Sequence, residues 1–367
     1  MSSTSYPRNA EDWRGRFIVD LAAGLGRRSD VRLTIWAPPG TLPPNVGSAA
    51  SADDERWLHT LSERGGIAHL LRHHKLRAAV ATLGLLHRLR NTYRRQPAHL
   101  VHVNWLQNAL PLWGSKTPAI VSVLGSDFGL LRMPGMRTAL RQVFGQRRTV
   151  IAPNAHWMAP QLESMFGDIA RIVTVPFGID ASWFALQRRP APHGVHQWLC
   201  VTRVTRAKIG DLFDWGNGLF GPHRMLHLFG PMQETLTLPD WVQYHGATHP
   251  AALLGEWFPK ASGLITLSRH DEGRPQVMLE AMAAGLPVIA SDLAAHRDII
   301  RHQHTGWLCG SREQLQGAFT ALEDPLQNDA IGQAARQWAR DDIGTWDDCA
   351  GRYALLYAAL LEENHDS

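Results

Sequence analysis

The fold is decided by the stretch LITLSRHDEGRPQVMLEAMAAGLPVIAS, residues 264–291. An apolar strand pattern runs into a polar loop, Pro275 is typical of a helix start, and Gly285 is typical of its end. Pro287 then precedes a second apolar run. This order of strand, loop, helix and strand predicts a βαβ unit on a parallel sheet.

Two glutamates flank the start of the predicted helix. Ligands of parallel sheets lie beyond the carboxyl ends of the strands, and a helix N-terminus offers N–H groups with partial positive charge. The loop 268–276 is therefore a candidate anion site. Glu272 lies just before the helix, and Glu280 lies a little over two turns further along. The alternative is an ordinary βαβ unit with two surface glutamates.

Short β-branched runs alternate with longer helical patterns on both sides of this stretch, which predicts two doubly wound domains. The expected strands are 31–36, 99–103, 119–123, 149–152, 171–175, 198–202, 225–229, 242–245, 263–267, 287–290 and 306–308. The expected helices are 11–26, 53–95, 133–146, 156–166 and 346–362. A Pro-rich polar stretch, residues 187–194, divides the pattern into domains 1–187 and 188–345, with helix 346–362 free to pack back on the first.

The composition is that of a globular protein with unequal charge in its two parts. The 367 residues exceed one ordinary core, and 44% of them are apolar and 19% charged. Residues 1–150 hold 21 Lys and Arg against 9 Asp and Glu, near +12, whereas the remainder holds 16 against 24, near −8. Three widely spaced cysteines favour a reduced cytoplasm over a zinc site or disulfide framework. No apolar run approaches the roughly 20 residues of a membrane span.

Residues 70–95 are both basic and rich in leucine. One interpretation is a basic amphipathic helix on an anionic membrane, where each Lys or Arg contributes about 1 kcal/mol. That would make the protein peripheral on the inner membrane face. The other is a solvated helix that covers a sheet with its leucines. Nucleic-acid binding is disfavoured, because Tyr93 is the only aromatic residue there.

The region around the two glutamates resembles a known family. Glu272 and Glu280 form an E-x7-E pair, and Gly273, Pro275 and the run 280–291 surround it as in the large retaining glycosyltransferase family, glycosyl transferases group 1. The resemblance implies the α/β GT-B fold, with two Rossmann-like doubly wound domains facing across a cleft. The first domain would bind the acceptor and the second the donor.

A second segment also resembles this family. Residues 201–210 resemble its G-R-x4-K-G segment, although Thr202 replaces the usual Gly. The resemblance implies that Arg203 and Lys208 grip the donor diphosphate, which suits a forked guanidinium and a compact ammonium. It further implies that Glu272 holds the donor sugar and Glu280 the nucleotide ribose. The remaining implied donor-site residues are Gly273, Arg274, Pro275, Gln276, Gly246 and Gly15.

The start of the chain departs from the family pattern. Gly15 either lets the backbone approach substrate phosphates or makes a tight helix entry. Leu124 stands where many relatives carry a histidine, which leaves Asp127, His102 and His156 as substitutes. Asp127, in a loop beyond a strand, is the favoured cleft residue and would orient an acceptor hydroxyl, whereas His102 fits a core histidine better. The expected first strand is reduced to residues 1–5.

The implied reaction is retaining transfer of a sugar from a nucleoside diphosphate to a glycan or lipid-linked acceptor, in bacterial surface polysaccharide synthesis. No Asp-x-Asp motif is present, so we expect no metal and no cofactor beyond the nucleotide sugar. The side chains of the second-domain loops do not indicate whether the donor nucleotide is UDP or GDP. A sugar-nucleotide epimerase, a phosphorylase and a catalytically silent glycan-binding or scaffold protein remain as alternatives.

Overall fold

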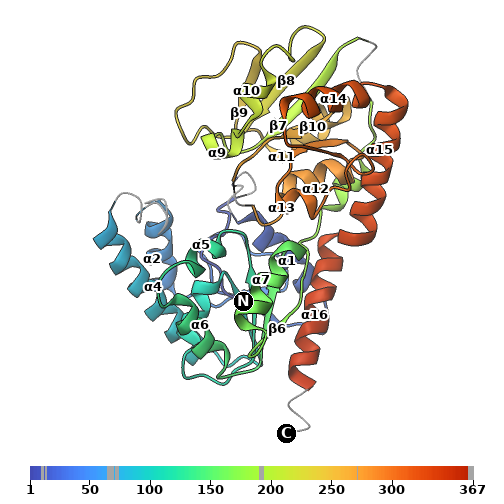
Figure 1. The fold of residues 1–367 in the computed structure, drawn as a ribbon. Helices are drawn as coiled ribbons and strands as arrows, with labels where there is room; N and C mark the ends of the chain where they lie inside the picture. Colours follow the sequence, from blue (N-terminus) through green and yellow to red (C-terminus); the bar gives the residue numbers. More distant parts are fainter. Residues whose placement is uncertain are drawn as a thin grey trace. The chain divides into compact units, whose positions relative to one another are not determined.

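The computed structural model describes residues 1–9, 12, 15–63, 70, 74–189, 194–270 and 272–362. Contacts divide the chain into two compact units, Met1–Phe177 with Trp346–Ser367, and Gly178–Thr345 (Figure 1). The first unit ends ten residues before the expected boundary at 187, because Ile179, Trp183 and Leu186 are buried in the core of the second unit. Four residues of the predicted linker, 190–193, lie outside the described residues.

The first unit holds parallel strands in two groups. A two-stranded sheet pairs β1 (Leu33–Ile35) with β2 (Val46–Ser48). A four-stranded sheet has the order β3 (Val101–Asn104), β4 (Ala119–Val123), β5 (Thr149–Pro153) and β6 (Arg171–Ile172). Ser2 bridges both Trp36 and Val103 in parallel, so the short initial segment links the two sheets. The predicted first strand is thus reduced to the two bridges of Ser2, and the sequence pattern missed β2.

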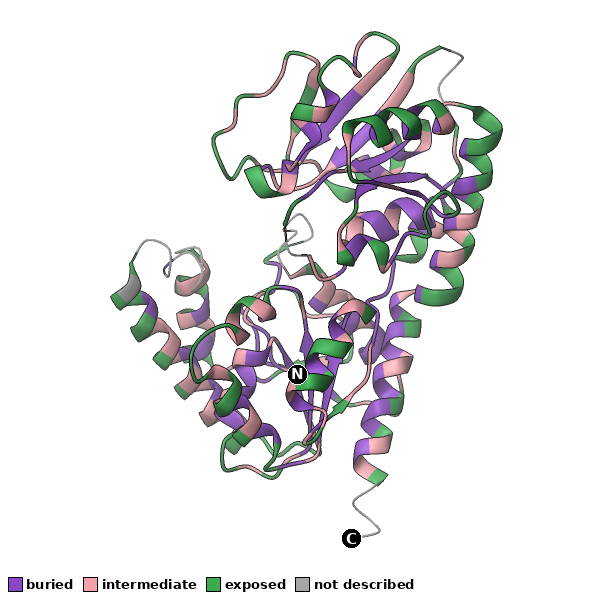
Figure 2. Cartoon of the chain, viewed as in Figure 1, coloured by how far each residue is buried: buried purple, intermediate pink, exposed green. Residues whose placement is uncertain are grey.

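The helices of the first unit pack on both faces of the four-stranded sheet and, beside it, on the residues that follow β1 and β2. They are α1 (Arg16–Gly26), α2 (Ala52–Glu63), α4 (Lys75–Arg95), α5 (Asp127–Leu131), α6 (Met136–Phe144), α7 (Ala159–Phe166) and α16 (Trp346–Glu362), with 3-10 turns η1 (Leu106–Leu112) and η2 (His156–Met158). Alternate residues of β4 enter different cores: Val121 packs with α6 and α7, and Ile120 packs with α1 and α16. Figure 2 shows the buried residues along the strands and the exposed ones on the outer sides of the helices.

The C-terminal helix lies in the first unit and holds a polar network in its core. The imidazole of His102 on β3 bonds the Tyr357 hydroxyl through Nδ1 at 2.6 Å and the Ser122 hydroxyl through Nε2 at 2.8 Å. Ser122 in turn bonds the Tyr353 hydroxyl at 2.6 Å. Burial lowers the pKa of His102 to about 3. His102 is therefore a satisfied, neutral core histidine.

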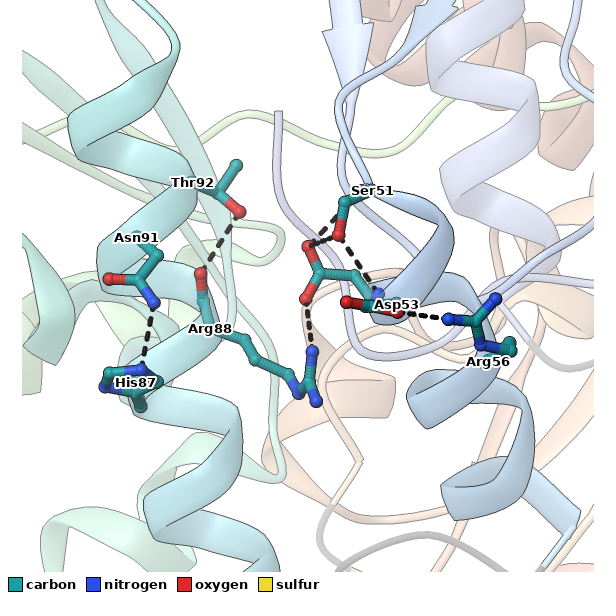
Figure 3. Close-up of polar contacts among 8 residues, drawn as sticks. Ser51, Asp53, Arg56, His87, Arg88, Asn91 and Thr92 are labelled. Carbon is teal, nitrogen blue, oxygen red and sulfur yellow. Dashed lines mark hydrogen bonds and ion pairs between the residues drawn. The ribbon is translucent and has the colours of Figure 1, made fainter.

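Among the described residues of the predicted helical stretch 53–95, α2 and α4 are separate helices rather than one. Arg88 of α4 donates from Nη1 to Asp54 Oδ1 of α2 at 2.9 Å, and its guanidinium lies over the Trp57 ring at 5.2 Å. Ser51 donates its hydroxyl to the same carboxylate at 2.9 Å (Figure 3). The pairing directs one of the predicted basic residues between the helices rather than outward.

Two non-glycine residues of the first unit have positive φ: Asn45, a residue type that tolerates it, and the bulky Trp105. Trp105 directly follows β3 and has φ 66° and ψ 138°, outside the left-handed helical region. A bulky residue in that conformation costs on the order of 1–3 kcal/mol and persists only where its surroundings impose it.

The second unit contains one parallel sheet of six strands. Their order is β12 (Trp307–Cys309), β11 (Val288–Ser291), β10 (Gly263–Thr266), β7 (His196–Val201), β8 (Arg224–Phe229) and β9 (Val242–Gly246). Every strand lies within two residues of its predicted bounds. Trp198 and Leu199 of β7 alternate between two apolar cores, as a sheet buried on both faces requires.

Helices pack on both faces of this sheet. They are α8 (Ala181–Ala185), α9 (Arg206–Ile209), α10 (Leu212–Gly216), α11 (Pro250–Ala252), α12 (Gln276–Ala283), α13 (Ala294–Arg297), α14 (Arg312–Leu322) and α15 (Pro325–Trp338), with short turns η3 (Leu253–Trp257), η4 (Phe258–Lys260) and η5 (Ala339–Ile343). Within the described part of the chain, no helix is both long and apolar enough to cross a membrane.

Candidate active site

The strand order of the second unit singles out one place for a ligand. From β7 the chain proceeds to β8 and β9 on one side, and from the neighbouring β10 to β11 and β12 on the other. Ligands of open parallel sheets bind beyond the carboxyl ends of the strands where the order reverses in this way. The loop 202–205 after β7 and the loop 267–275 after β10 meet at this switch point.

Backbone contacts hold the two loops together. Arg269 donates its N–H to the Ala207 carbonyl at 2.8 Å, and Asp211 donates to the Leu267 carbonyl at 3.1 Å. Between these contacts Gly210 has φ 56°, and a Cβ atom there would lie 1.9 Å from the Leu267 oxygen. Only glycine allows this approach, so the glycine of the 201–210 segment serves to bring the two loops into contact.

Lys208 and Glu272 form an ion pair across this junction. The Lys208 ammonium bonds Glu272 Oε1, and both side chains are only 14% exposed. Lys208 lies in α9, whose first turn is capped by Thr205: its hydroxyl accepts the Lys208 N–H at 3.2 Å. The Ser268 hydroxyl approaches the same glutamate oxygen at 3.4 Å. The structure thus brings together Lys208 and Glu272, to which the resemblance gave the donor diphosphate and the donor sugar.

Arg203 adds a second positive charge near this pair. Burial lowers the pKa of Lys208 below its ordinary value, attraction to Glu272 opposes the shift, and repulsion from Arg203 adds to it. Lys208 and Arg203 thus supply two cations beside the Glu272 carboxylate at the carboxyl edge of the sheet. Such a site suits an anion with several oxygen acceptors.

The segment before α12 is fixed by buried contacts. The Arg274 guanidinium, 2% exposed, pairs with Asp298, and the Gln276 amide donates to the Gly178 carbonyl at 2.8 Å. These two predicted donor-binding side chains therefore contact the protein itself, and the backbone of residues 273–276 is what they position. Glu280 lies partly exposed in the second turn of α12.

A histidine that the sequence analysis missed lies next to the ion pair. His296 is fully buried, with Nδ1 2.8 Å from the Ser291 carbonyl oxygen, while Nε2 has no hydrogen-bond partner among the described residues. Burial lowers its pKa, and the charges of Glu272 and Lys208 both act on it. The sequence could have indicated His296, because it follows the carboxyl end of β11. That edge of the sheet also carries the predicted loops after β7 and β10.

The remaining predicted residues lie elsewhere. Gly246 ends the edge strand β9 with φ 70°. Gly15 begins α1 with φ 68°, and a Cβ there would lie 2.7 Å from the Ser5 carbonyl carbon, as expected for the tight helix entry. Asp127 is 2% exposed: its carboxylate accepts the N–H of Leu106 at 2.9 Å and of Leu124 at 2.8 Å. The expectation that Asp127 faces a cleft is therefore wrong. Its carboxylate is buried and joins the loops after β3 and β4.

Metal binding was also considered. Across the residues that the structure describes, no three His, Cys, Asp or Glu side chains gather as metal ligands would. The prediction of a metal-independent reaction stays a prediction.

Comparisons with known proteins give the fold. The sequence model of the family Glycosyl transferases group 1 matches residues 222–328. A GDP-mannose-dependent alpha-(1-6)-phosphatidylinositol monomannoside mannosyltransferase of Mycobacterium tuberculosis is 24% identical in an alignment 296 residues long, which covers 70% of this chain and 75% of that protein.

Two solved structures are similar over nearly the whole chain. Sucrose-phosphate synthase of Thermosynechococcus elongatus aligns with a TM-score of 0.71 and 15% identity, covering 99% of this chain and 98% of that one. The Anabaena protein HepE in complex with UDP-glucose aligns with a TM-score of 0.64 and 14% identity, covering 98% of both chains. The predicted fold is confirmed: the chain has the GT-B fold with two Rossmann-like domains, and its residues 222–328 match the group 1 glycosyl transferases.

Proposed function

We propose that this protein is a retaining, metal-independent glycosyltransferase that moves a sugar from a nucleoside diphosphate to a hydroxyl acceptor. The observation that carries the proposal is the buried Lys208–Glu272 ion pair at the switch point beyond β7 and β10, close enough to Arg203 for its charge to act on Lys208. The names of the similar proteins support it, since one is GDP-mannose-dependent and another was solved with UDP-glucose.

Each residue has a distinct role in this proposal. Negative charge develops on the diphosphate as the glycosidic bond loosens, and Arg203, Lys208 and the amides near Gln276 stabilise it. Fixed cations of this kind need no reorganisation during the reaction, and loss of one contact lowers the rate by about 10²-fold. Glu272 orients the sugar hydroxyls, and Glu280 binds the ribose.

The Lys208–Glu272 pair also keeps the two side chains of the site in place. The carboxylate holds the ammonium in place, although burial disfavours its charge. A diphosphate offers more negative charge than one carboxylate, so Lys208 turns to it while Glu272 becomes available to the sugar. Lys208 would then exchange the Glu272 carboxylate for the diphosphate when the donor binds, and return to Glu272 when it leaves.

The proposal is tested by nucleotide binding to the native protein and to Glu280→Ala. Nucleoside diphosphates and their sugars should raise the unfolding temperature of the native protein, and calorimetry should give their affinities. We expect one base to be preferred and its binding to weaken at least tenfold in Glu280→Ala, but not in the control Glu256→Ala, whose side chain is exposed. No binding near millimolar concentration would favour the silent alternative, and donor turnover without an acceptor would favour the epimerase.

For the acceptor we propose a glycan or lipid-linked sugar of a bacterial surface polysaccharide, bound at an anionic membrane. A specific surface supports the membrane part. Leu76, Val80 and Leu83 are 86%, 71% and 69% exposed, and their spacing places them on one face of α4. The same face continues into exposed His87 and Arg94. An apolar end followed by basic residues fits insertion of the helix tip among acyl chains beneath anionic headgroups.

Flotation with vesicles of equal phosphatidylglycerol and phosphatidylcholine at low salt tests this surface. We expect the native protein to float with the vesicles and Val80→Ser with Leu83→Ser to lose most of that binding. Leu326→Ser is the control, because Leu326 is 84% exposed in the other unit. Equal flotation of all variants, or none by the native protein, would reject the membrane surface.

A further inference from the structure

The strained residue of the first unit lies at the edge of its sheet where ligands bind. Trp105 directly follows β3, with φ 66° and ψ 138°, and begins η1. In open parallel sheets this carboxyl edge is the ligand side. Unusual backbone conformations concentrate at functional sites, where the surrounding structure imposes them.

Hydrogen bonds on both sides impose this conformation. Trp105 donates its N–H to the Ser122 carbonyl at 3.0 Å, and its own carbonyl accepts the Asn108 N–H at 3.1 Å. The next residue, Leu106, donates its N–H to the buried Asp127 carboxylate at 2.9 Å. Asp127 also accepts the Leu124 N–H, so one carboxylate ties the loop after β3 to the loop after β4.

The result is a tryptophan residue that remains partly exposed between buried neighbours. Asn104 and Leu106 are fully buried, whereas Trp105 is not. Its ring meets the edge of Phe17 at a centroid distance of 5.8 Å, and Phe17 stacks on Phe177 at 4.9 Å. A turn with positive φ would ordinarily carry glycine or asparagine. A tryptophan at such a position therefore points to a use for its ring.

Other aromatic side chains follow the neighbouring strands at the same edge. Phe128, in α5 after β4, stacks on Trp157, in η2 after β5, with centroids 5.5 Å apart. Leu124, partly exposed, lies in the loop after β4. This edge of the first unit thus carries several aromatic and apolar side chains, which suits a ligand with an apolar face better than a diphosphate.

We propose that Trp105 is the stacking platform for a pyranose ring of the acceptor, and that Asp127 is the positioning residue that holds it there. The electron-rich face of an indole attracts the C–H groups on one face of a sugar ring, and it fixes the plane of the sugar without requiring a charge. This inference rests on the proposed glycosyl transfer and names the recognition chemistry of its acceptor side.

The test compares Trp105→Gly, Trp105→Phe and the control Trp113→Ala, whose tryptophan is 46% exposed in the same unit. Glycine accepts the positive φ, so Trp105→Gly should unfold at the same temperature or higher. The probes are octyl α-D-mannopyranoside and octyl α-D-glucopyranoside. Calorimetry gives their binding, and product formation with the preferred nucleotide sugar gives KM and kcat.

We expect Trp105→Gly to bind the glycosides at least tenfold more weakly and to raise KM for them by a similar factor, with nucleoside diphosphate affinity unchanged. Trp105→Phe should recover part of the binding, and Trp113→Ala should behave like the native protein. Nucleotide binding without glycoside binding in the native protein would overturn the inference, as would an unchanged KM in Trp105→Gly. Failure of nucleotide binding itself would instead reject the proposed function.

Discussion

The Lys208–Glu272 pair gives a prediction whose size follows from its burial. Exposed ion pairs contribute about 0.2–1 kcal/mol, and removing one partner of a fully buried pair costs about 3–5 kcal/mol. With each side chain 14% exposed, we expect Lys208→Met or Glu272→Gln to cost about 2 kcal/mol. For a unit of this size, that lowers the unfolding temperature by about 4–8 °C.

The assay is thermal unfolding of both single variants and the double variant. Because the two residues contact each other, their effects should not add, and the double variant should be clearly more stable than the sum predicts. Arg297→Met provides the control: Arg297 pairs with Asp292, but these side chains are 61% and 38% exposed, so its effect should stay below about 1 kcal/mol.

Nucleotide binding separates the two partners further. Lys208→Met should lose most of the stabilisation by a nucleoside diphosphate, since a cation for the phosphates is gone. Glu272→Gln should keep or increase it, because the site becomes more positive. Additive stability effects would show that the pair does not interact, and a loss of diphosphate binding in Glu272→Gln as large as in Lys208→Met would refute the assigned roles.

Three further predictions concern the scaffold. Burial lowers the pKa of His102 to about 3 in the folded protein, against about 6.5 in the unfolded chain. The stability that neutral His102 contributes is therefore complete above pH 6.5 and falls by about 1.4 kcal/mol per pH unit below it. His102→Gln should flatten the decline of the unfolding temperature between pH 6.5 and 4. Gly210→Ala should destabilise the second unit by more than about 1 kcal/mol in thermal unfolding, since its Cβ would meet Leu267, whereas Gly317→Ala, in an open helical position, should be neutral or stabilising. Asp127→Ala leaves two buried N–H groups without their acceptor and should cost about 2–6 kcal/mol in denaturant unfolding; a cost below 1 kcal/mol would contradict its joining role.

The order of most strands and helices could be predicted from the sequence, and so could the two loops that meet at the switch point. The alternation of apolar residues in a strand and their spacing in a helix can both be read from residues close together in the sequence. The strands β4 and β7–β12 could therefore be located almost to the residue. The glutamates and the lysine were found because their spacing along the chain follows a recognisable pattern. Element ends and single bridges, such as the pairing of Ser2 between two strands, depend on distant partners and were not predictable.

Only the tertiary structure decided what several side chains do. Nothing near Asp127 in the sequence shows that its carboxylate caps a loop after a different strand, and nothing near Arg274 shows its buried partner Asp298. His296 joins the site because β11 ends at the same edge of the sheet as β10. The sequence alone determined the pattern of elements and the chemical types at the carboxyl edge, since these are local; which of those groups are buried, paired or strained depends on contacts between residues far apart in the chain.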